Sequence, residues 1–351
     1  MTIRGTTASR PTTVRPAPSG PRSLGPRSLG PRSLGPGKAR DDAAEQRATW
    51  ILLGPALVFL AAFSIWPFVY LLYASFTSYQ LAIPIPIEWV GFKNFSRVIT
   101  NPRFWSSLEI TAVFALVAVP LQIVLGLALA LLLNGVTRGR EAYASLFLIP
   151  MMVAPIVVGF SWNLFTNPIY GPLNAALRGL GFDPPAWAAS PRWALPTLVF
   201  VDTWQWTPFV MVVLLAGLKA IPPRIYEAAK VDGSNGWQSF FHIVLPMLYP
   251  YLTVALVLRF IDSFRVFDII YILTRGGPGT STQNLAYYTY DMGFGRFDFG
   301  IAGALSIIQL ILLIGGTSLI LALARRREQM PSLSSPAPAS LRGRALEGAD
   351  S

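Results

Sequence analysis

Six long apolar runs constrain this chain more than any other feature of its sequence. They cover residues 50–76, 108–133, 144–165, 193–218, 246–273 and 301–324. Each is long enough to cross a hydrocarbon core, which takes about 20 helical residues. Only 13% of the residues are charged, about half the fraction of a soluble domain, so a soluble protein could not cover six such segments. We therefore predict an all-α polytopic membrane protein with six transmembrane helices, because backbone groups in lipid must pair within their own segment.

Prolines and basic residues refine this prediction. Kinks are expected where prolines interrupt the runs, at Pro55, Pro67, Pro120, Pro155, Pro196 and Pro208. Nineteen of the 28 Lys and Arg residues lie before residue 50, in segments 135–143 and 219–245, and after residue 324. Only seven lie in segments 74–107, 167–192 and 274–300. Because cytoplasmic loops carry the excess of Lys and Arg, both termini are predicted to be cytoplasmic, and the net charge of +11 reflects topology rather than nucleic-acid binding.

Two tails flank the apolar region, at residues 1–49 and 326–351. Both are rich in Pro, Arg, Ser and Gly, and residues 20–36 repeat the unit Gly-Pro-Arg-Ser-Leu three times. Such a composition cannot bury a core, so both tails are predicted to be disordered. The basic N-terminal tail either contacts anionic lipid or contributes to orientation alone, and both readings stay open.

Several kinds of chemistry are excluded by composition. The chain has no cysteine and a single histidine, His242, so thiolate metal sites, histidine clusters and cysteine nucleophiles are not expected, and no metal site is predicted. A phosphate-binding loop needs Gly-Lys-Ser or Gly-Lys-Thr, and none of the four lysines is followed by Ser or Thr. The chain is therefore predicted not to be an enzyme.

The most informative segment is the predicted cytoplasmic loop at 219–245. It contains Glu227, Ala228 and Ala229, then Gly233, and it leads into Leu245 and Pro246. This order of helix formers, Gly and Pro predicts a short helix, a turn and a second helix outside the bilayer. Its apolar residues, which lipid does not explain, favour a protein partner: Ile225, Ala228, Ala229, Phe240 and Phe241. The alternative is an amphipathic helix on the membrane surface.

This loop resembles the coupling signature of inner-membrane permeases of binding-protein-dependent ABC importers, with Glu-Ala-Ala, Gly and Ile-x-Leu-Pro at the family's spacing. Further stretches resemble the carbohydrate-uptake branch of that family: residues 91–95, 170–174, 204–209 and 273–278. The resemblance covers about residues 50–325. It implies a type I importer permease fold and a location in a prokaryotic cytoplasmic membrane.

The resemblance also implies roles and partners. Glu227 would be the polar contact to a separate ATPase dimer, which binds the ATP and Mg, so that this chain needs no cofactor. Ala228 and Ala229 would allow close packing, Gly233 would make the turn, and Asp232, Leu245 and Pro246 complete the coupling loop. The other partners would be a homologous second permease in a heterodimer, an external solute-binding protein, a sugar and the lipid bilayer.

The solute is expected to be a disaccharide such as trehalose or maltose, with glycerol 3-phosphate or a polyol as alternatives. An ion-coupled secondary transporter would belong to a different class, and such a protein does not need the loop at 219–245. A membrane-embedded enzyme would need a nucleophile and base that this sequence does not offer.

Four charges inside the fifth run are candidates for the solute pathway: Arg259, Asp262, Arg265 and Asp268. A charge at mid-bilayer costs about 2.5–3.5 kcal/mol, which makes a functional role the default. Consecutive members neighbour one another, but each step of three falls about 60° short of a full turn. We therefore expect that the four cannot all line one cavity and that Asp262 and Arg265 are the pair that binds sugar hydroxyls. The alternative is a structural ladder of ion pairs.

The fourth run adds Asp202, Trp204, Trp206 and Phe209. Asp202 could face the solute or pair with Arg192 near the outer surface. The three aromatic side chains could stack on sugar rings, or they could pack between helices and form part of an interfacial belt.

Overall fold

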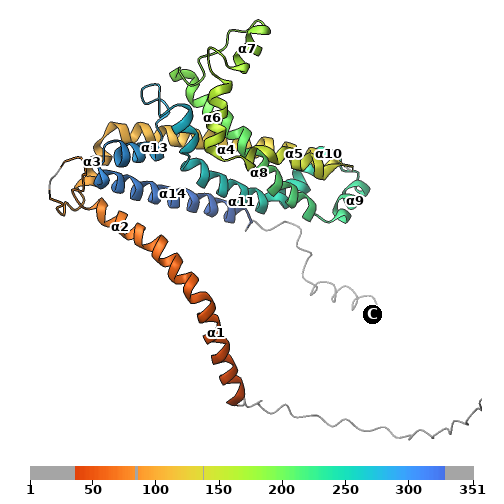
Figure 1. The fold of residues 1–351 in the computed structure, drawn as a ribbon. Helices are drawn as coiled ribbons and strands as arrows, with labels where there is room; N and C mark the ends of the chain where they lie inside the picture. Colours follow the sequence, from red (N-terminus) through yellow and green to blue (C-terminus); the bar gives the residue numbers. More distant parts are fainter. Residues whose placement is uncertain (1–35, 84–85, 137, 329–351) are drawn as a thin grey trace, which may run out of the picture. The chain divides into compact units, whose positions relative to one another are not determined.

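A computed structural model describes residues 36–83, 86–136 and 138–328, which are almost entirely helical and contain no β-strand (Figure 1). These residues belong to two compact units, one ending at Ile65 and the other beginning at Trp66. The predicted all-α class is confirmed.

The first unit contains helix α1 (Pro36–Leu60) and a π-helical turn, η1 (Ala61–Ile65). Helix α1 begins at Pro36 and therefore includes residues 36–49 of the predicted N-terminal tail. The sequence from Ala43 to Ala48 consists of Ala, Glu, Gln and Arg, which are strong helix formers, and Pro suits a first helical position. The rest of the predicted N-terminal tail, and residues 329–351 of the C-terminal tail, lie outside the described residues.

The second unit contains the remaining helices. Five of them, α4, α6, α7, α8 and α9, begin with Pro, whose missing N–H costs nothing at the first helical position. The bounds of all helices in this unit are as follows. They are α2 (Trp66–Ser75), α3 (Lys93–Thr100), α4 (Pro102–Gly135), α5 (Arg140–Met152), α6 (Pro155–Phe165), α7 (Pro172–Gly179), α8 (Pro191–Ala220), α9 (Pro223–Val231), α10 (Gly236–Ser239), η2 (Phe240–Val244), α11 (Leu245–Phe264), α12 (Asp268–Leu273), α13 (Leu285–Tyr290), η3 (Asp291–Gly295) and α14 (Phe299–Glu328).

Among the described residues, five helical segments are long and apolar enough to cross a membrane: Thr49–Ser75, Pro102–Gly135, Pro191–Ala220, Gly236–Leu273 and Phe299–Arg326. The predicted third span is instead a pair of helices, α5 and α6, that meet at 89° and make a sixth crossing only if both count as one broken span. Pro155 explains the break, because it lacks an N–H and keeps Ala154 extended, at a ψ of 136°.

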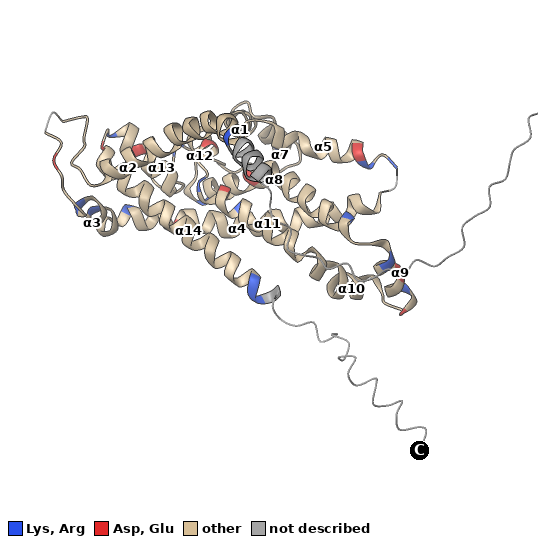
Figure 2. Cartoon of the chain, turned by 90° about the horizontal axis from the view of Figure 1, so that it is seen from below, with Lys and Arg blue, Asp and Glu red and all other residues tan. Residues whose placement is uncertain are grey.

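Helices α4, α8 and α11 pack closely at two glycines. A Cβ on Gly126 of α4 would lie 2.6 Å from Val210 Cγ1 of α8, and one on Gly217 of α8 would lie 2.6 Å from Tyr251 Cγ of α11. Small residues allow helix backbones in a membrane to approach one another in this way. Charged residues gather mainly at loops and helix ends, with a further group near α8, α11 and α12 (Figure 2).

Candidate functional site

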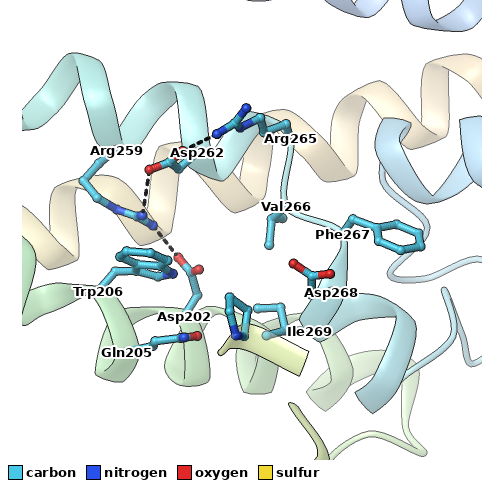
Figure 3. A pocket seen from close by; sticks show the side chains of 11 residues that line it. Asp202, Gln205, Trp206, Arg259, Asp262, Arg265, Val266, Phe267, Asp268 and Ile269 are labelled. Atoms are coloured by element: carbon cyan, nitrogen blue, oxygen red, sulfur yellow. Dashed lines mark hydrogen bonds and ion pairs between the residues drawn. The ribbon is translucent and has the colours of Figure 1, made fainter. Parts of the chain in front are cut away.

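A cavity of about 350 Å³ lies where α8, α11 and α12 meet the start of α6 (Figure 3). Its lining residues are Pro155, Asp202, Gln205, Trp206, Arg259, Asp262, Arg265, Val266, Phe267, Asp268 and Ile269. The cavity therefore contains all five intramembrane charges that the sequence singled out.

All four charges of the fifth run line this one cavity, so the expectation that they could not is wrong. That expectation assumed one continuous helix, whereas α11 ends at Phe264 and α12 begins at Asp268. Asn284 Nδ2 donates a hydrogen bond to the Val266 carbonyl within the break, at 2.5 Å. Because α11 ends at Phe264, the regular rotation of successive side chains about the helix axis also ends there. Arg265 and Asp268 are therefore not held on opposite helix faces from Arg259 and Asp262, and all four can line one cavity.

The buried side of the cavity is a closed polar network that connects three spans. Arg259 is fully buried and donates from Nη2 to Asp202 Oδ2 at 3.0 Å and from Nε to Gln122 Oε1 at 2.8 Å. Gln122 Nε2 donates to the same Asp202 oxygen at 2.7 Å. The Arg259 guanidinium also lies over the ring of Trp206, 4.9 Å from its centroid. Asp202 thus pairs with Arg259 of α11, and not with Arg192 as one of our alternatives held.

The exposed side of the cavity carries a second ion pair. Arg265 Nη2 lies 3.1 Å from Asp262 Oδ1, and the two side chains are 65% and 38% exposed. Asp262 Oδ2 also lies 3.7 Å from Arg259 Nη1, too far for a hydrogen bond. Asp268 forms no ion pair with any described residue. Asp262 and Arg265 therefore form an ion pair at an accessible position, where a solute could compete for both partners.

Two buried polar atoms of cavity-lining residues have no hydrogen-bond partner among the described residues: Arg259 Nη1 and Gln205 Oε1. Gln205 Nε2 donates to the Val153 carbonyl at 3.0 Å, which leaves the amide oxygen as the unpaired atom. Burying a polar atom without a hydrogen bond costs free energy. The residues that line this cavity therefore retain one donor, Arg259 Nη1, and one acceptor, Gln205 Oε1, for which a partner would be favourable.

Sequence reasoning did not select Gln122 and Gln205 as site residues. A signal was present, because each is an uncharged amide inside a long apolar run. Amide side chains in membrane helices face partners within the bundle more often than lipid.

The three aromatic candidates of α8 lie in different surroundings. Trp206 lines the cavity, whereas Trp204 and Phe209 do not. Trp204 is 43% exposed and makes an edge-to-face contact with Trp162 of α6, at 5.7 Å between ring centroids. Phe209 packs against the hydrophobic cluster shared by α4, α8 and α11. Packing between helices thus accounts for two of the three aromatic residues.

The loop after α8 folds as the sequence predicts, into a short helix, a turn and a second helix. The turn closes α9 with two hydrogen bonds, from Ser234 N–H to the Ala229 carbonyl and from Gly233 N–H to the Lys230 carbonyl. This pattern is a Schellman motif, and Gly233 supplies the left-handed residue it requires, at a φ of +75°. Asn235 and Gln238 then form a capping box that starts α10.

One prediction concerns this turn. Gly233→Val is expected to destabilise the loop by about 1–2 kcal/mol, because a branched side chain is strained in the left-handed region. Gly233→Asn is the control, since Asn tolerates that conformation. Limited proteolysis of the purified protein should cut the loop of the Val variant faster, and equal rates for both variants would contradict the assigned role of Gly233.

The two alanines of this loop differ in their surroundings. Ala229 is 5% exposed, so its close packing is within this chain, whereas Glu227 and Ala228 are exposed. Ile225 and Tyr226 pack against the cluster of α4, α8 and α11. Burial raises the pKa of the Tyr226 hydroxyl above its usual value, so this side chain stays neutral. One face of α9 is thus attached to the bundle and the other is free.

Leu245 and Pro246, which close the predicted coupling loop, are the first two residues of α11. Asp232 is the exposed C-cap residue that follows the last residue of α9. The coupling segment therefore continues directly into the helix that carries Arg259 and Asp262.

Other stretches that the sequence singled out hold loops in place. Asn94 Nδ2 donates to the carbonyls of Ser75 and Thr77, at 2.9 and 2.8 Å. Asn174 accepts from Trp187 Nε1 at 2.6 Å and donates to the Asn167 carbonyl at 2.9 Å. These asparagines position connecting segments and do not line the cavity.

Comparison with known proteins identifies relatives of this chain. Residues 122–329 match the family described as binding-protein-dependent transport system inner membrane component. The trehalose/maltose transport system permease protein MalF of Thermococcus litoralis is 40% identical over 286 residues, which cover 81% of this chain and 95% of that protein. The sulfoquinovosyl glycerol transport system permease protein SmoG of Agrobacterium fabrum is 34% identical, over 82% of this chain and 93% of that protein.

Two further similarities extend this picture. The trehalose transport system permease protein SugA of Mycobacterium tuberculosis is 32% identical, over 76% of this chain and 84% of that protein. Among solved structures, a chain of a bacterial alginate ABC transporter, in complex with an alginate-bound periplasmic protein, superimposes with a TM-score of 0.72 at 24% identity. That match covers 83% of this chain and 99% of the other, and it establishes the importer permease fold.

Proposed function

The chain belongs to the binding-protein-dependent transport system inner membrane components, in their carbohydrate-uptake branch, and we propose that it forms half of the translocation pathway of a disaccharide importer. It is a multi-pass membrane subunit of a sugar ABC importer. In our proposal both termini are cytoplasmic, a homologous permease supplies the other half, and a separate ATPase dimer binds ATP and Mg. An external binding protein delivers the solute to the outer loops.

The observation that carries the proposal is the continuity between α9 and the cavity. The exposed face of α9 presents Glu227, and its other face, through Ile225 and Tyr226, packs on the hydrophobic cluster of the helices that carry Asp202 and Arg259. A partner that moves α9 would therefore also move α8 and α11. This arrangement supports alternating access, in which nucleotide state and solute act on the same two conformations through their different affinities for each.

Within the cavity, Asp262 and Arg265 are the proposed contacts to sugar hydroxyls. Their ion pair is partly exposed, so that exchanging it for hydrogen bonds to a solute costs little. The buried pair of Asp202 and Arg259 holds the inner side of the site, and Trp206 and Asp268 also line the cavity. Trp204 and Phe209 do not line it and are not assigned a role in solute binding.

Substrate uptake tests this assignment. The complex with its ATPase, second permease and binding protein, reconstituted in liposomes, should take up trehalose or maltose and should hydrolyse ATP faster in their presence. A panel that includes glycerol 3-phosphate and polyols distinguishes the alternative solutes. Uptake of a polyol or of glycerol 3-phosphate, without uptake of any disaccharide, would contradict the proposed solute.

Arg265→Ala tests the site itself. We expect the KM for the sugar to rise by about 10-fold, because a charged hydrogen bond contributes about 1.5–3 kcal/mol, with little loss of protein yield. Arg275→Ala, in the outer segment beyond α12, is the control, because Arg275 does not line the cavity. Unchanged uptake and unchanged solute preference in Arg265→Ala would leave Arg265 a structural role only.

A further inference from the structure

The cavity contains more carboxylates than guanidinium groups. Asp202, Asp262 and Asp268 face Arg259 and Arg265, which leaves one net negative charge. Both guanidinium groups are already engaged, Arg259 by Asp202 and Asp262, and Arg265 by Asp262. Asp268 remains without an ion-pair partner among the described residues, and its side chain belongs to the cavity lining (Figure 3). A solute that enters therefore meets an uncompensated carboxylate.

The unmet hydrogen-bonding atoms favour the same class of solute. Arg259 Nη1 needs an acceptor and Gln205 Oε1 needs a donor, and both residues are fully buried. A hydroxyl group can serve both atoms, because it donates one hydrogen bond and accepts others. A fully ionised phosphate, sulfonate or carboxylate group offers acceptors only, so the charged group itself cannot pair with Gln205 Oε1.

We propose that this cavity selects uncharged polyhydroxy solutes over their anionic derivatives, with Asp268 as the specificity-determining residue and Gln205 as the residue that demands a solute hydroxyl. The inference rests on the proposed function and adds a charge filter inside the permease, separate from any selection by the binding protein. Asp268 is exposed, so a negative charge that enters the cavity beside it is repelled at short range and is partly screened by water. The same filter disfavours glycerol 3-phosphate.

Binding to the permease itself tests this filter. The reconstituted complex of both permeases and the ATPase, in nanodiscs without binding protein, is titrated with radiolabelled trehalose, and trehalose 6-phosphate is added as competitor. We expect the wild type to bind the phosphate ester at least about 10-fold more weakly than trehalose, as expected for one uncompensated charge. Asp268→Asn should reduce that ratio and Asp268→Lys should bring it close to one. Gln205→Met should weaken the binding of both compounds, because each carries hydroxyl groups that can donate to Gln205 Oε1.

Asp183→Asn, an exposed carboxylate outside the cavity, is the matched control and should retain the wild-type ratio. Equal competition by both compounds in the wild type would overturn the filter while leaving the proposed sugar import intact. An unchanged ratio in both Asp268 variants, with thermal unfolding like that of the wild type, would overturn the role of Asp268. Binding of neither compound would contradict the proposed disaccharide itself, and the inference with it.

Discussion

Glu227→Ala is expected to abolish the sugar-stimulated ATP hydrolysis of the assembled transporter, and with it uptake, while the permease stays folded. Glu227 is exposed on α9 and makes no hydrogen bond or ion pair with the described residues, so its removal costs this chain little stability. Its expected contact is to the ATPase. A charge-assisted contact at an interface, when truncated, costs about 2–5 kcal/mol, or at least about a 10-fold loss of coupling.

The measurement is ATPase activity in nanodiscs, with and without sugar-loaded binding protein, together with the yield of ATPase that copurifies with the permease. Glu141→Ala is the control, because Glu141 is also an exposed carboxylate in the first turns of a helix but lies outside the coupling loop. Full sugar stimulation in Glu227→Ala would show that α9 is not the polar contact to the ATPase.

Arg259→Met is expected to cause the largest loss of stability among the charged residues of the cavity. It leaves Asp202 buried without a cation and Gln122 without its donor. Breaking a buried ion pair by removing one partner costs about 3–5 kcal/mol, because the remaining charge is uncompensated. We expect a clear fall in the Tm of the purified complex and in its yield.

Two further variants test this explanation. Arg265→Met breaks the exposed pair with Asp262, which is expected to contribute only about 0–1 kcal/mol, so its Tm should stay close to that of the wild type. The double variant Asp202→Asn with Arg259→Gln removes both charges and keeps amides that can pair with Gln122, so it should recover part of the loss. Equal Tm values for Arg259→Met and Arg265→Met would refute the buried network as a source of stability.

Local sequence patterns predicted much of the fold because the signals are local. Apolar runs define spans from composition alone, and Gly233 predicted a turn because it occupies a position that favours a residue without a Cβ. Sequence patterns did less well where a helix is interrupted. The break at 265–267 has no Pro or Gly to announce it, and Asn284, which bonds within it, lies 18 residues from Val266.

The sequence by itself determined that this is a helical membrane protein, where five of its spans lie, and which loop carries the coupling pattern. These properties depend on hydrophobicity and on spacing between neighbours in the chain, and both can be read along it. Tertiary structure alone decided that Arg259 is buried with Asp202 and Gln122, that Trp204 and Trp206 face different surroundings, and that Asp268 joins the cavity. The partners of Arg259 lie 57 and 137 residues away. The choice of such partners depends on which helix faces meet, and that is a property of packing between spans rather than of any one span.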